Sequence, residues 1–257
     1  MTEWLYGKHA VSEAIVAGRR RVHRLLLASG RANGGEKASD IEDLAKRGKI
    51  SIEKVENSRL DALTRVGHHH QGVAAEVSPY TYASISDVLG MCRDAGQNAL
   101  VIVLDQLQDP QNFGTLLRSA EAVGVTAIVM LDRRQVEVTP AVVNASSGAV
   151  EHLHICLANN LPRAIESLQE AGLWVYALQA EASAALYTAS DLTGPVGLVV
   201  GSEGRGISRL VRERCDGALA IPMNGRVESL NAAVAGSLVL YEVLRQRMAR
   251  TVQGVAG

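Results

Sequence analysis

The chain has 257 residues, enough for one large domain or two small ones, and 47% of them are hydrophobic, so a buried core is expected. The formal net charge is −1, so overall electrostatics do not indicate a nucleic-acid partner. No apolar run is long enough to span a bilayer, and the first residues lack the pattern of a secretory signal, which favours a cytoplasmic location. Three widely spaced cysteines argue against a disulfide framework or a zinc knuckle and are typical of reduced core thiols.

Charge is unevenly divided along the chain. Residues 1–78 hold 13 basic and 10 acidic side chains, whereas the remainder holds 13 and 17. The cluster Arg19-Arg-Arg-Val-His-Arg24 supplies much of the basic excess. A surface that faces nucleic acid and a solvated loop are both compatible with this cluster.

The first 78 residues predict a compact alternating α/β module. Periodicity indicates helices at 10–16, 41–47 and 58–66 and strands at 22–28, 50–55 and 72–77. Residues 79–84 break the pattern, and a helix at 85–93 precedes a polar turn. We therefore place a flexible linker at residues 79–97.

The rest of the chain alternates again and predicts a parallel sheet with helices on both faces. The expected helix that follows the first strand covers residues 112–123. The expected strands are 100–104, 127–131, 152–156, 173–178, 196–200 and 218–221.

Residues 68–70 are three consecutive histidines, a residue type that binds metals, but their pattern does not favour a metal site. Adjacent residues 68–70 on an extended chain point alternately to opposite faces, and no cysteine or carboxylate pattern completes a ligand set. No metal site is therefore expected. His152 and His154 are expected to share one face of a strand.

A glycine-rich loop, Gly201-Ser-Glu-Gly-Arg-Gly206, follows an apolar strand, a position where loops of parallel sheets bind ligands. Its glycine spacing is wrong for a nicotinamide fold, and no phosphate loop is present, which argues against a dinucleotide-dependent oxidoreductase. A plain strand-to-helix turn is the simpler alternative.

The stretch from Ile221 to Tyr241 joins a polar loop to a run without charge between Glu228 and Glu242. We expect a buried helix with Ser229 as the preferred N-cap, whose free N–H groups favour a lone-pair-rich ligand. Because the helix is apolar on nearly all sides, it implies a second packing partner, such as another subunit.

Three stretches in order resemble the motifs of the SpoU (TrmH) family of RNA 2′-O-ribose methyltransferases. They are Asp109-Pro-Gln-Asn-Phe-Gly-Thr-Leu-Leu-Arg-Ser-Ala-Glu-Ala-Val-Gly124, Leu198-Val-Val-Gly-Ser-Glu-Gly-Arg-Gly-Ile207 and Ile221-Pro-Met-Asn-Gly-Arg-Val-Glu-Ser-Leu-Asn-Ala-Ala-Val-Ala235. The resemblance implies a SPOUT catalytic domain at residues 98–257, with a deep trefoil knot that forms an S-adenosylmethionine pocket. Residues 1–78 more loosely resemble the RNA-binding domain of a 23S rRNA guanosine methyltransferase in that family.

The resemblance also implies roles for particular residues. The implied cofactor-binding residues are Gly201, Ile221, Met223 and Leu230, and the implied catalytic residues are Asn112, Arg118, Glu203, Ser229 and Asn231. Alone, Asn112 and Arg118 would read as a helix cap and a surface arginine, and Glu203 as an exposed loop residue. An arginine is a poor base, so a grip on phosphate suits Arg118 better than proton transfer.

The expected function is 2′-O-methylation of RNA with S-adenosylmethionine, without a metal, by a homodimer that acts on a guanosine of 23S rRNA. A transfer-RNA 2′-O-methyltransferase of the same family is one alternative. A non-catalytic RNA-binding or ribosome assembly factor is another, although the residues at 112, 118, 203, 229 and 231 argue against it.

Overall fold

The computed structural model describes residues 2–29, 36–64, 70–133, 136–179, 184–202, 204–227 and 229–255, with side chains omitted for 36–39 and 252–255. The chain divides into two compact units. The first comprises residues 1–81 and 137–152, and the second comprises residues 82–136 and 153–257. The first unit thus draws its residues from two separate parts of the chain.

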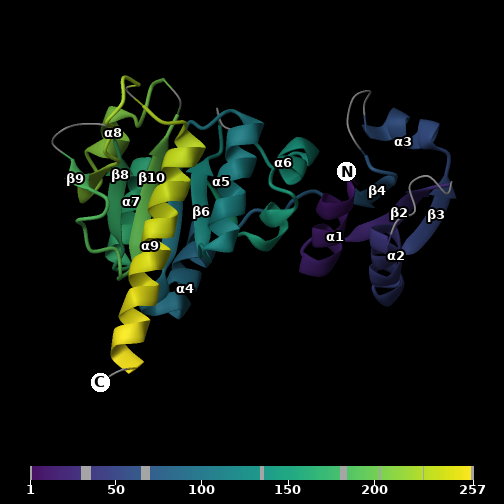
Figure 1. The fold of residues 1–257 in the computed structure, drawn as a ribbon, viewed down its shortest axis with the longest axis horizontal. Helices are drawn as coiled ribbons and strands as arrows, with labels where there is room; N and C mark the ends of the chain where they lie inside the picture. The colour runs from purple at the N-terminus through teal and green to yellow at the C-terminus, as the bar shows by residue number, and fades with distance from the viewer. Residues whose placement is uncertain are drawn as a thin grey trace. The chain divides into compact units, whose positions relative to one another are not determined.

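The first unit is a four-stranded sheet with helices, ordered β1-β4-β2-β3 (Figure 1). Only the β2–β3 pair is parallel. Its elements are β1 (Glu3–Tyr6), α1 (Lys8–Ala17), β2 (Val22–Ala28), α2 (Glu36–Arg47), β3 (Ser51–Val55), α3 (Asn57–Thr64), β4 (Val73–Val77), α6 (Pro140–Ala145) and a 3₁₀ helix, η3 (Ala149–His152). This confirms a small N-terminal α/β module, although β1 was not predicted.

The α6–η3 segment is held in the first unit by a buried ion pair. The Arg20 side chain, 1% exposed, donates from Nε to Glu151, whose side chain is fully buried, at 3.0 Å. Its Nη1 donates to Glu3 at 2.8 Å, and its guanidinium lies 5.3 Å from the ring centroid of Tyr80. Burial raises the pKa of Glu151, although the charge of Arg20 opposes the shift. A buried carboxylate in this position depends on its partner.

The second unit is a seven-stranded sheet with the order β7-β6-β5-β10-β8-β11-β9, in which every neighbouring pair is parallel (Figure 1). It confirms the predicted α/β fold class with a parallel sheet. The elements are α4 (Ile85–Ala95), a 3₁₀ helix η2 (Gly96–Asn98), β5 (Leu100–Asp105), α5 (Pro110–Ala122), β6 (Ala127–Leu131), β7 (Ile155–Ala158), α7 (Leu161–Glu170), β8 (Trp174–Leu178), β9 (Ala185–Leu186), β10 (Val196–Gly201), α8 (Arg209–Arg212), β11 (Gly217–Ala220) and α9 (Ala232–Val255).

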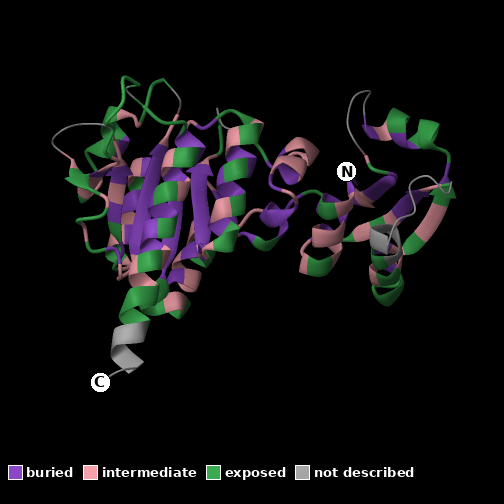
Figure 2. Cartoon of the chain, in the orientation of Figure 1, coloured by how far each residue is buried: buried purple, intermediate pink, exposed green. Residues whose placement is uncertain are grey.

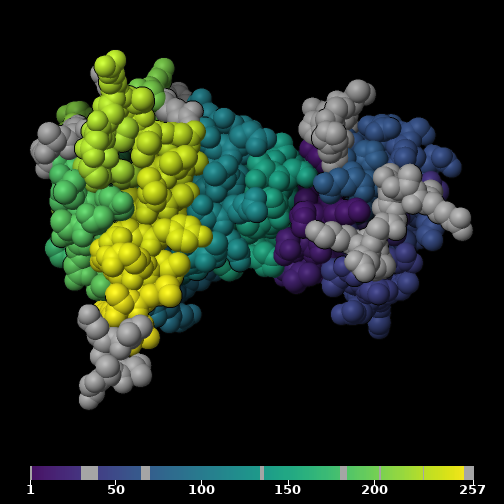
Figure 3. Space-filling model, viewed as in Figure 1, coloured from purple at the N-terminus to yellow at the C-terminus, as the bar shows by residue number. Residues whose placement is uncertain are grey.

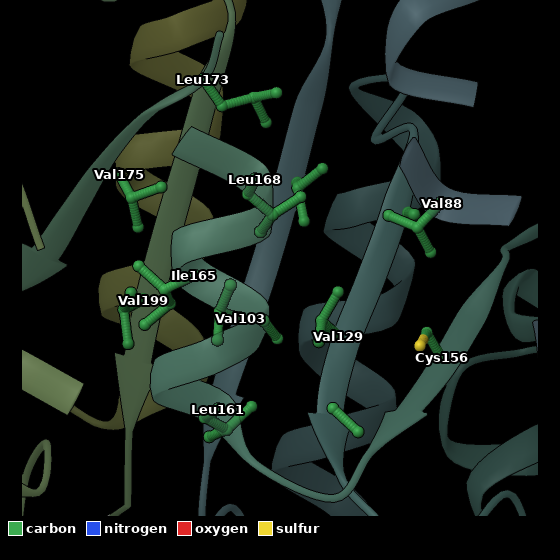
Figure 4. Packing of buried hydrophobic residues seen from close by; sticks show 14 of the residues in the cluster. Val88, Val103, Val129, Cys156, Leu161, Ile165, Leu168, Leu173, Val175 and Val199 are labelled. Atoms are coloured by element: carbon green, nitrogen blue, oxygen red, sulfur yellow. The ribbon is translucent and has the colours of Figure 1, made fainter. Parts of the chain in front are cut away.

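The core of the second unit lies on both faces of this sheet (Figure 2). Strand β5 is buried along its whole length, and β6 and β10 are buried up to their last residue. On one face, Leu161, Ile165 and Leu168 of α7 pack over valines of the central strands, such as Val103 and Val199 (Figure 4). Helix α4 contributes to the same cluster, so part of the stretch expected to be a linker is packed in this core. On the other face lie α5 and α9.

One strand prediction was misplaced. Residues 149–152 form η3, and β7 begins only at Ile155, so His152 and His154 do not share a strand face. His152 instead contacts Glu13 at 2.8 Å. The residues from 152 to 156 alone fit a strand. However, η3 ends at His152, and its Glu151 forms the ion pair with Arg20, a contact between residues 131 positions apart.

Helix α9 is buried on one face only in the single chain. The other face, for which the sequence implied a second packing partner, is open. Its Val239, Leu240 and Val243 are buried, whereas Leu238 and Tyr241 are 42% and 52% exposed. Figure 3 shows the helix as a surface feature in yellow. Because α5 and the sheet cover only one side, the opposite side keeps an apolar surface.

The three cysteines are free thiols. Burial raises the pKa of Cys92, and it raises those of Cys156 and Cys215 to about 11 and about 12. These thiols therefore stay protonated at neutral pH and are weak nucleophiles.

We predict that Arg20→Ala lowers the free energy of unfolding of the first unit by about 3 kcal/mol, because Glu151 is left buried without its partner. Denaturant unfolding should be followed by Trp4 fluorescence in a Trp174→Phe background, which leaves one tryptophan. The matched control is the exposed Arg21→Ala, with an expected change below about 0.5 kcal/mol. Equal effects of the two substitutions would contradict the role assigned to the ion pair.

Candidate functional site

A cavity of about 460 Å³ opens where several parallel strands of the second unit end. Most of its wall comes from three stretches: the end of β8 at Leu178–Gln179, the end of β10 with the loop to Ile207, and the end of β11 with the loop that precedes α9. Residues of α8 and of the first turn of α9 complete it. The carboxyl ends of parallel strands meet at one edge of the sheet, which is where ligands of open α/β folds bind. The cavity is therefore the candidate ligand site.

All four residues proposed from the sequence to hold a cofactor line this cavity. They are Gly201, Ile221, Met223 and Leu230. Met223 and Leu230 are each 36% exposed, so apolar surface faces the opening. The cavity thus combines apolar side chains with backbone groups of two loops, a composition typical of small-molecule sites.

Gly201 is required by a close backbone crossing. A Cβ atom at this position would lie 2.3 Å from the carbonyl carbon of Gly206 and 2.6 Å from the nitrogen of Ile207. Ser202 and Gly206 exchange backbone hydrogen bonds of 3.1 and 2.9 Å, which close the loop between them. The lack of a side chain therefore lets the loop fold back over the end of β10 and shape the cavity wall.

A hydrogen bond joins the two polar residues expected at the site. Asn231 donates from Nδ2 to Oδ1 of Asn112 at 2.9 Å. Asn231 also accepts from the backbone N–H groups of Ala233 and Val234, at 2.9 and 3.2 Å, and so caps α9. The N-cap is therefore Asn231 and not Ser229, because the helix begins at Ala232.

Helix α5, which follows β5, the strand next to β10, carries the expected residues Asn112 and Arg118. Asp109 is its N-cap and accepts from Gln111 at 2.7 Å, and Pro110 follows at the first helical position. Asn112 lies in the first turn and donates to Asp109 at 3.3 Å. Arg118 lies on the same helix, with an exposed side chain.

Helices α5 and α9 are packed closely, which fixes the site residues that they carry. A Cβ atom on Gly236 would lie 2.8 Å from Leu116. Ser237 donates to Ser119 at 2.8 Å across the same contact. The two helix N-termini are thereby held side by side at the edge where the cavity opens.

The remaining site predictions have different outcomes. Ser229 is exposed and lines the cavity. Glu203 lies outside the described residues, as do His68 and His69. His70 contacts Asp61 at 3.0 Å. In the described ranges no group of three or more histidine, cysteine or acidic side chains is arranged to hold a metal ion.

Sequence reasoning missed several residues of the cavity wall. Arg205, Arg212 and Gln179 all line it. Gln179 follows directly after β8, so the rule that ligands bind at the carboxyl ends of strands could have identified it. Arg212 lies on α8, and nothing in the neighbouring sequence marks it as a residue of the cavity wall.

Comparison with known proteins agrees with this geometry. Residues 99–241 match the SpoU rRNA Methylase family, and residues 4–83 match the RNA 2′-O ribose methyltransferase substrate binding domain. The chain belongs to the SpoU rRNA methylase family. It is therefore an RNA methyltransferase of the SpoU/TrmH type.

Relatives named as TrmH family tRNA/rRNA methyltransferases match nearly the whole chain. One from Staphylococcus saprophyticus is 41% identical over 243 residues, which is 95% of each chain. YacO from Bacillus subtilis is 39% identical over 245 residues, 95% of this chain and 96% of its own. Both parts of the chain thus occur together in these relatives.

Solved structures share the fold. AviRb from Streptomyces viridochromogenes, in complex with AdoMet, has a TM-score of 0.79 at 24% identity and covers 96% of this chain and 91% of its own. An AdoMet-bound rRNA methyltransferase from Sinorhizobium meliloti has a TM-score of 0.78 at 23% identity, with 95% and 87% covered. Among the described residues of this family member, no helix is long and apolar enough to cross a membrane.

Proposed function

We propose that the protein transfers a methyl group from S-adenosylmethionine to the ribose 2′-oxygen of a guanosine in 23S rRNA, like the family member RlmB. The observation that carries this proposal is the hydrogen bond between Asn231 and Asn112. It joins the loop that lines the cavity to the helix that carries Arg118. This bond supports a site in which a small-molecule pocket and an exposed cation that can hold RNA lie on connected elements.

The residues present fit this cofactor. Because Gly201 has no side chain, the backbone at Gly206 can lie against it and form the cavity wall, and Ile221, Met223 and Leu230 offer apolar surface to an adenosyl group. When bound, S-adenosylmethionine supplies an activated methyl group on a sulfonium. The protein then has to hold the 2′-oxygen in line with that methyl group and exclude competing geometries. AdoMet complexes of AviRb and the Sinorhizobium meliloti enzyme support this assignment.

Arg118 is proposed to bind an RNA phosphate and orient the ribose. Its guanidinium is exposed on α5, where a strand of RNA can reach it. A guanidinium remains protonated and forms paired hydrogen bonds with phosphate oxygens, so it suits binding more than proton removal. The neighbouring Asn112 and Asn231, with Ser229, supply neutral polar groups for the ribose hydroxyls. Glu203 is proposed to accept a hydrogen bond from this group.

Residues 1–78, which lie in the first unit, are proposed to bind substrate RNA, and residues 98–257 to form the catalytic domain. The substrate-binding match to residues 4–83 supports this role. Within the basic cluster, Arg20 is buried in its ion pair, whereas Arg21 and His23 are exposed. The exposed members of the cluster are therefore proposed to contact RNA. The enzyme distinguishes RNA from DNA because only RNA has the 2′-hydroxyl that accepts the methyl group.

A homodimer with a knotted catalytic domain completes the proposal. Val234, Leu238, Tyr241 and Met248 are 42 to 61% exposed and recur at helical spacing on α9. Such a row of apolar side chains is typical of a helix packed against a partner. A second subunit on this row would border the cavity, because α9 begins beside it.

The reaction can be tested with labelled S-adenosylmethionine and 23S rRNA or tRNA that lacks the modification. We expect label in 2′-O-methylguanosine of 23S rRNA. Arg118→Ala should lower the rate about 100-fold or more, because the phosphate loses its charged partner. The matched control is Arg163→Ala, an exposed arginine on α7 on the other sheet face, which should keep the wild-type rate.

The product distinguishes the alternatives. Label in tRNA would support the proposed reaction but identify tRNA, in place of 23S rRNA, as the substrate. Absence of label from both RNAs, with S-adenosylmethionine bound, would contradict the catalytic proposal and favour an assembly factor. Equal rates for the Arg118 and Arg163 variants would contradict the role of Arg118.

Cofactor binding is expected to weaken in the Gly201→Ala variant. The added Cβ would force the loop at Gly206 away from β10, so affinity for S-adenosylmethionine in calorimetry should fall at least about tenfold. Gly90→Ala is the matched control, because Gly90 lies in α4, does not line the cavity, and a Cβ there meets only the end of the Arg93 side chain at 3.9 Å; its affinity should stay within about twofold. Wild-type affinity in the Gly201 variant would place the cofactor elsewhere.

The dimer is tested by light scattering after size-exclusion chromatography. We expect Leu238→Glu and Tyr241→Glu to convert a wild-type dimer to a monomer, since each buries a charge in the apolar interface. Val16→Glu, at a 57% exposed position in the first unit, should remain dimeric. A dimer that persists in both α9 variants would exclude this helix face as the interface.

A further inference from the structure

Asp105 is a buried acid at the edge of the candidate site for which the reaction above requires no role. It is the last residue of β5 and is 1% exposed. In the parallel register of β5 and β10 it stands opposite Gly201, the glycine that the loop crosses. A buried carboxylate is costly, so its hydrogen bonds indicate what it does.

One carboxylate oxygen of Asp105 holds the returning loop. Oδ2 accepts the backbone N–H of Ser208 at 2.7 Å, a bond between residues 103 positions apart. The other oxygen, Oδ1, is buried and meets no hydrogen-bond donor in the part of the chain that the structure describes. Among the described residues, one carboxylate oxygen therefore forms no hydrogen bond, and the other forms a short one to Ser208.

The bond to Ser208 closes the far end of the loop that walls the cavity. At the near end, Ser202 and Gly206 exchange two hydrogen bonds. Beyond Gly206, the chain lies against Gly201, and residues 204–207 all line the cavity. Without the Asp105 bond, the segment after Gly206 would lose the contact that ties it to the neighbouring strand.

Asp105 also begins the turn that leads to the catalytic helix. Gln106 has a φ of 63°, uncommon for a residue with a side chain, and Leu107 is buried. Asp109 then caps α5, which carries the candidate catalytic residues. Asp105 therefore ties the cofactor loop to the strand that positions α5.

We propose that Asp105 is a positioning residue that holds the 202–208 loop in the shape required for S-adenosylmethionine, through its bond to the Ser208 N–H. The proposal rests on the proposed function for the identity of the ligand. Asp105 itself acts through the loop and does not line the cavity.

The test compares two substitutions at the same position. Asp105→Ala removes the acceptor, and we expect affinity for S-adenosylmethionine to fall at least tenfold in calorimetry. Asp105→Asn keeps a carbonyl oxygen that can accept the same N–H, and we expect affinity within about threefold of wild type. Hydrogen exchange at Ser208, measured without cofactor, should be faster in the alanine variant only.

Asp216→Ala is a matched control for stability. Asp216 accepts the backbone N–H of Val175 at 2.7 Å, a bond of the same kind near the amino ends of β8 and β11, away from the cavity. We expect it to lower the melting temperature while leaving cofactor affinity unchanged. A general loss of stability would instead lower both affinities in parallel.

Three results would overturn the proposal: wild-type affinity in Asp105→Ala, equal loss in the alanine and asparagine variants, or unchanged exchange at Ser208. The failure of the proposed function looks different. Wild-type protein that binds S-adenosylmethionine but methylates no RNA would refute that function and leave the Asp105 comparison valid. If wild-type protein bound no cofactor, Asp105 would no longer have a role in binding it.

Discussion

The close approach of two backbone segments at Gly201 is the constraint on which the candidate site depends. The chain leaves β10, turns back through Gly204 and Gly206, and passes so near that a single added carbon would overlap the carbonyl carbon of Gly206. Glycines with positive φ at 204 and 206 make this return possible. The cavity wall is thus built from backbone, and its shape follows from the path of the chain more than from particular side chains.

Helix packing extends that constraint to the polar residues. Gly236 lets α9 approach α5 closely, and the bond between Ser237 and Ser119 sets the two helices in register. Their N-termini then bring Asn231 within hydrogen-bond distance of Asn112. The cavity and helix α5 become neighbours because both begin at carboxyl ends of strands in one parallel sheet.

Much of this arrangement could be predicted from local patterns. The buried strands of the second unit are continuous apolar runs, and its parallel order follows from their alternation with helices. The motif segments identified all four cavity residues proposed to hold a cofactor, starting with Gly201. What local patterns could not reveal are features set by distant contacts. Glu151 and Asp105 each bond to a residue more than a hundred positions away.

The same limit explains the errors. The two-residue strand β9 carries too little pattern to be recognised, and the strand expected at residues 152–156 begins only at Ile155, after η3. Glu151 of η3 pairs with Arg20, which lies 131 positions away and leaves no local signal. The open face of α9 is not such an error, because the apolar run predicted a helix that needs a second packing partner, and one face is open in the single chain. We propose that a partner subunit covers that face.

A crystal structure of the protein with S-adenosylmethionine tests the central claim most directly. We predict ligand density in the cavity between the loop at 201–207 and the loop at 221–230, with backbone contacts from both loops and its methyl group facing the side of Asn112 and Arg118. Ligand bound outside this cavity, or bound within it but turned away from α5, would contradict the account.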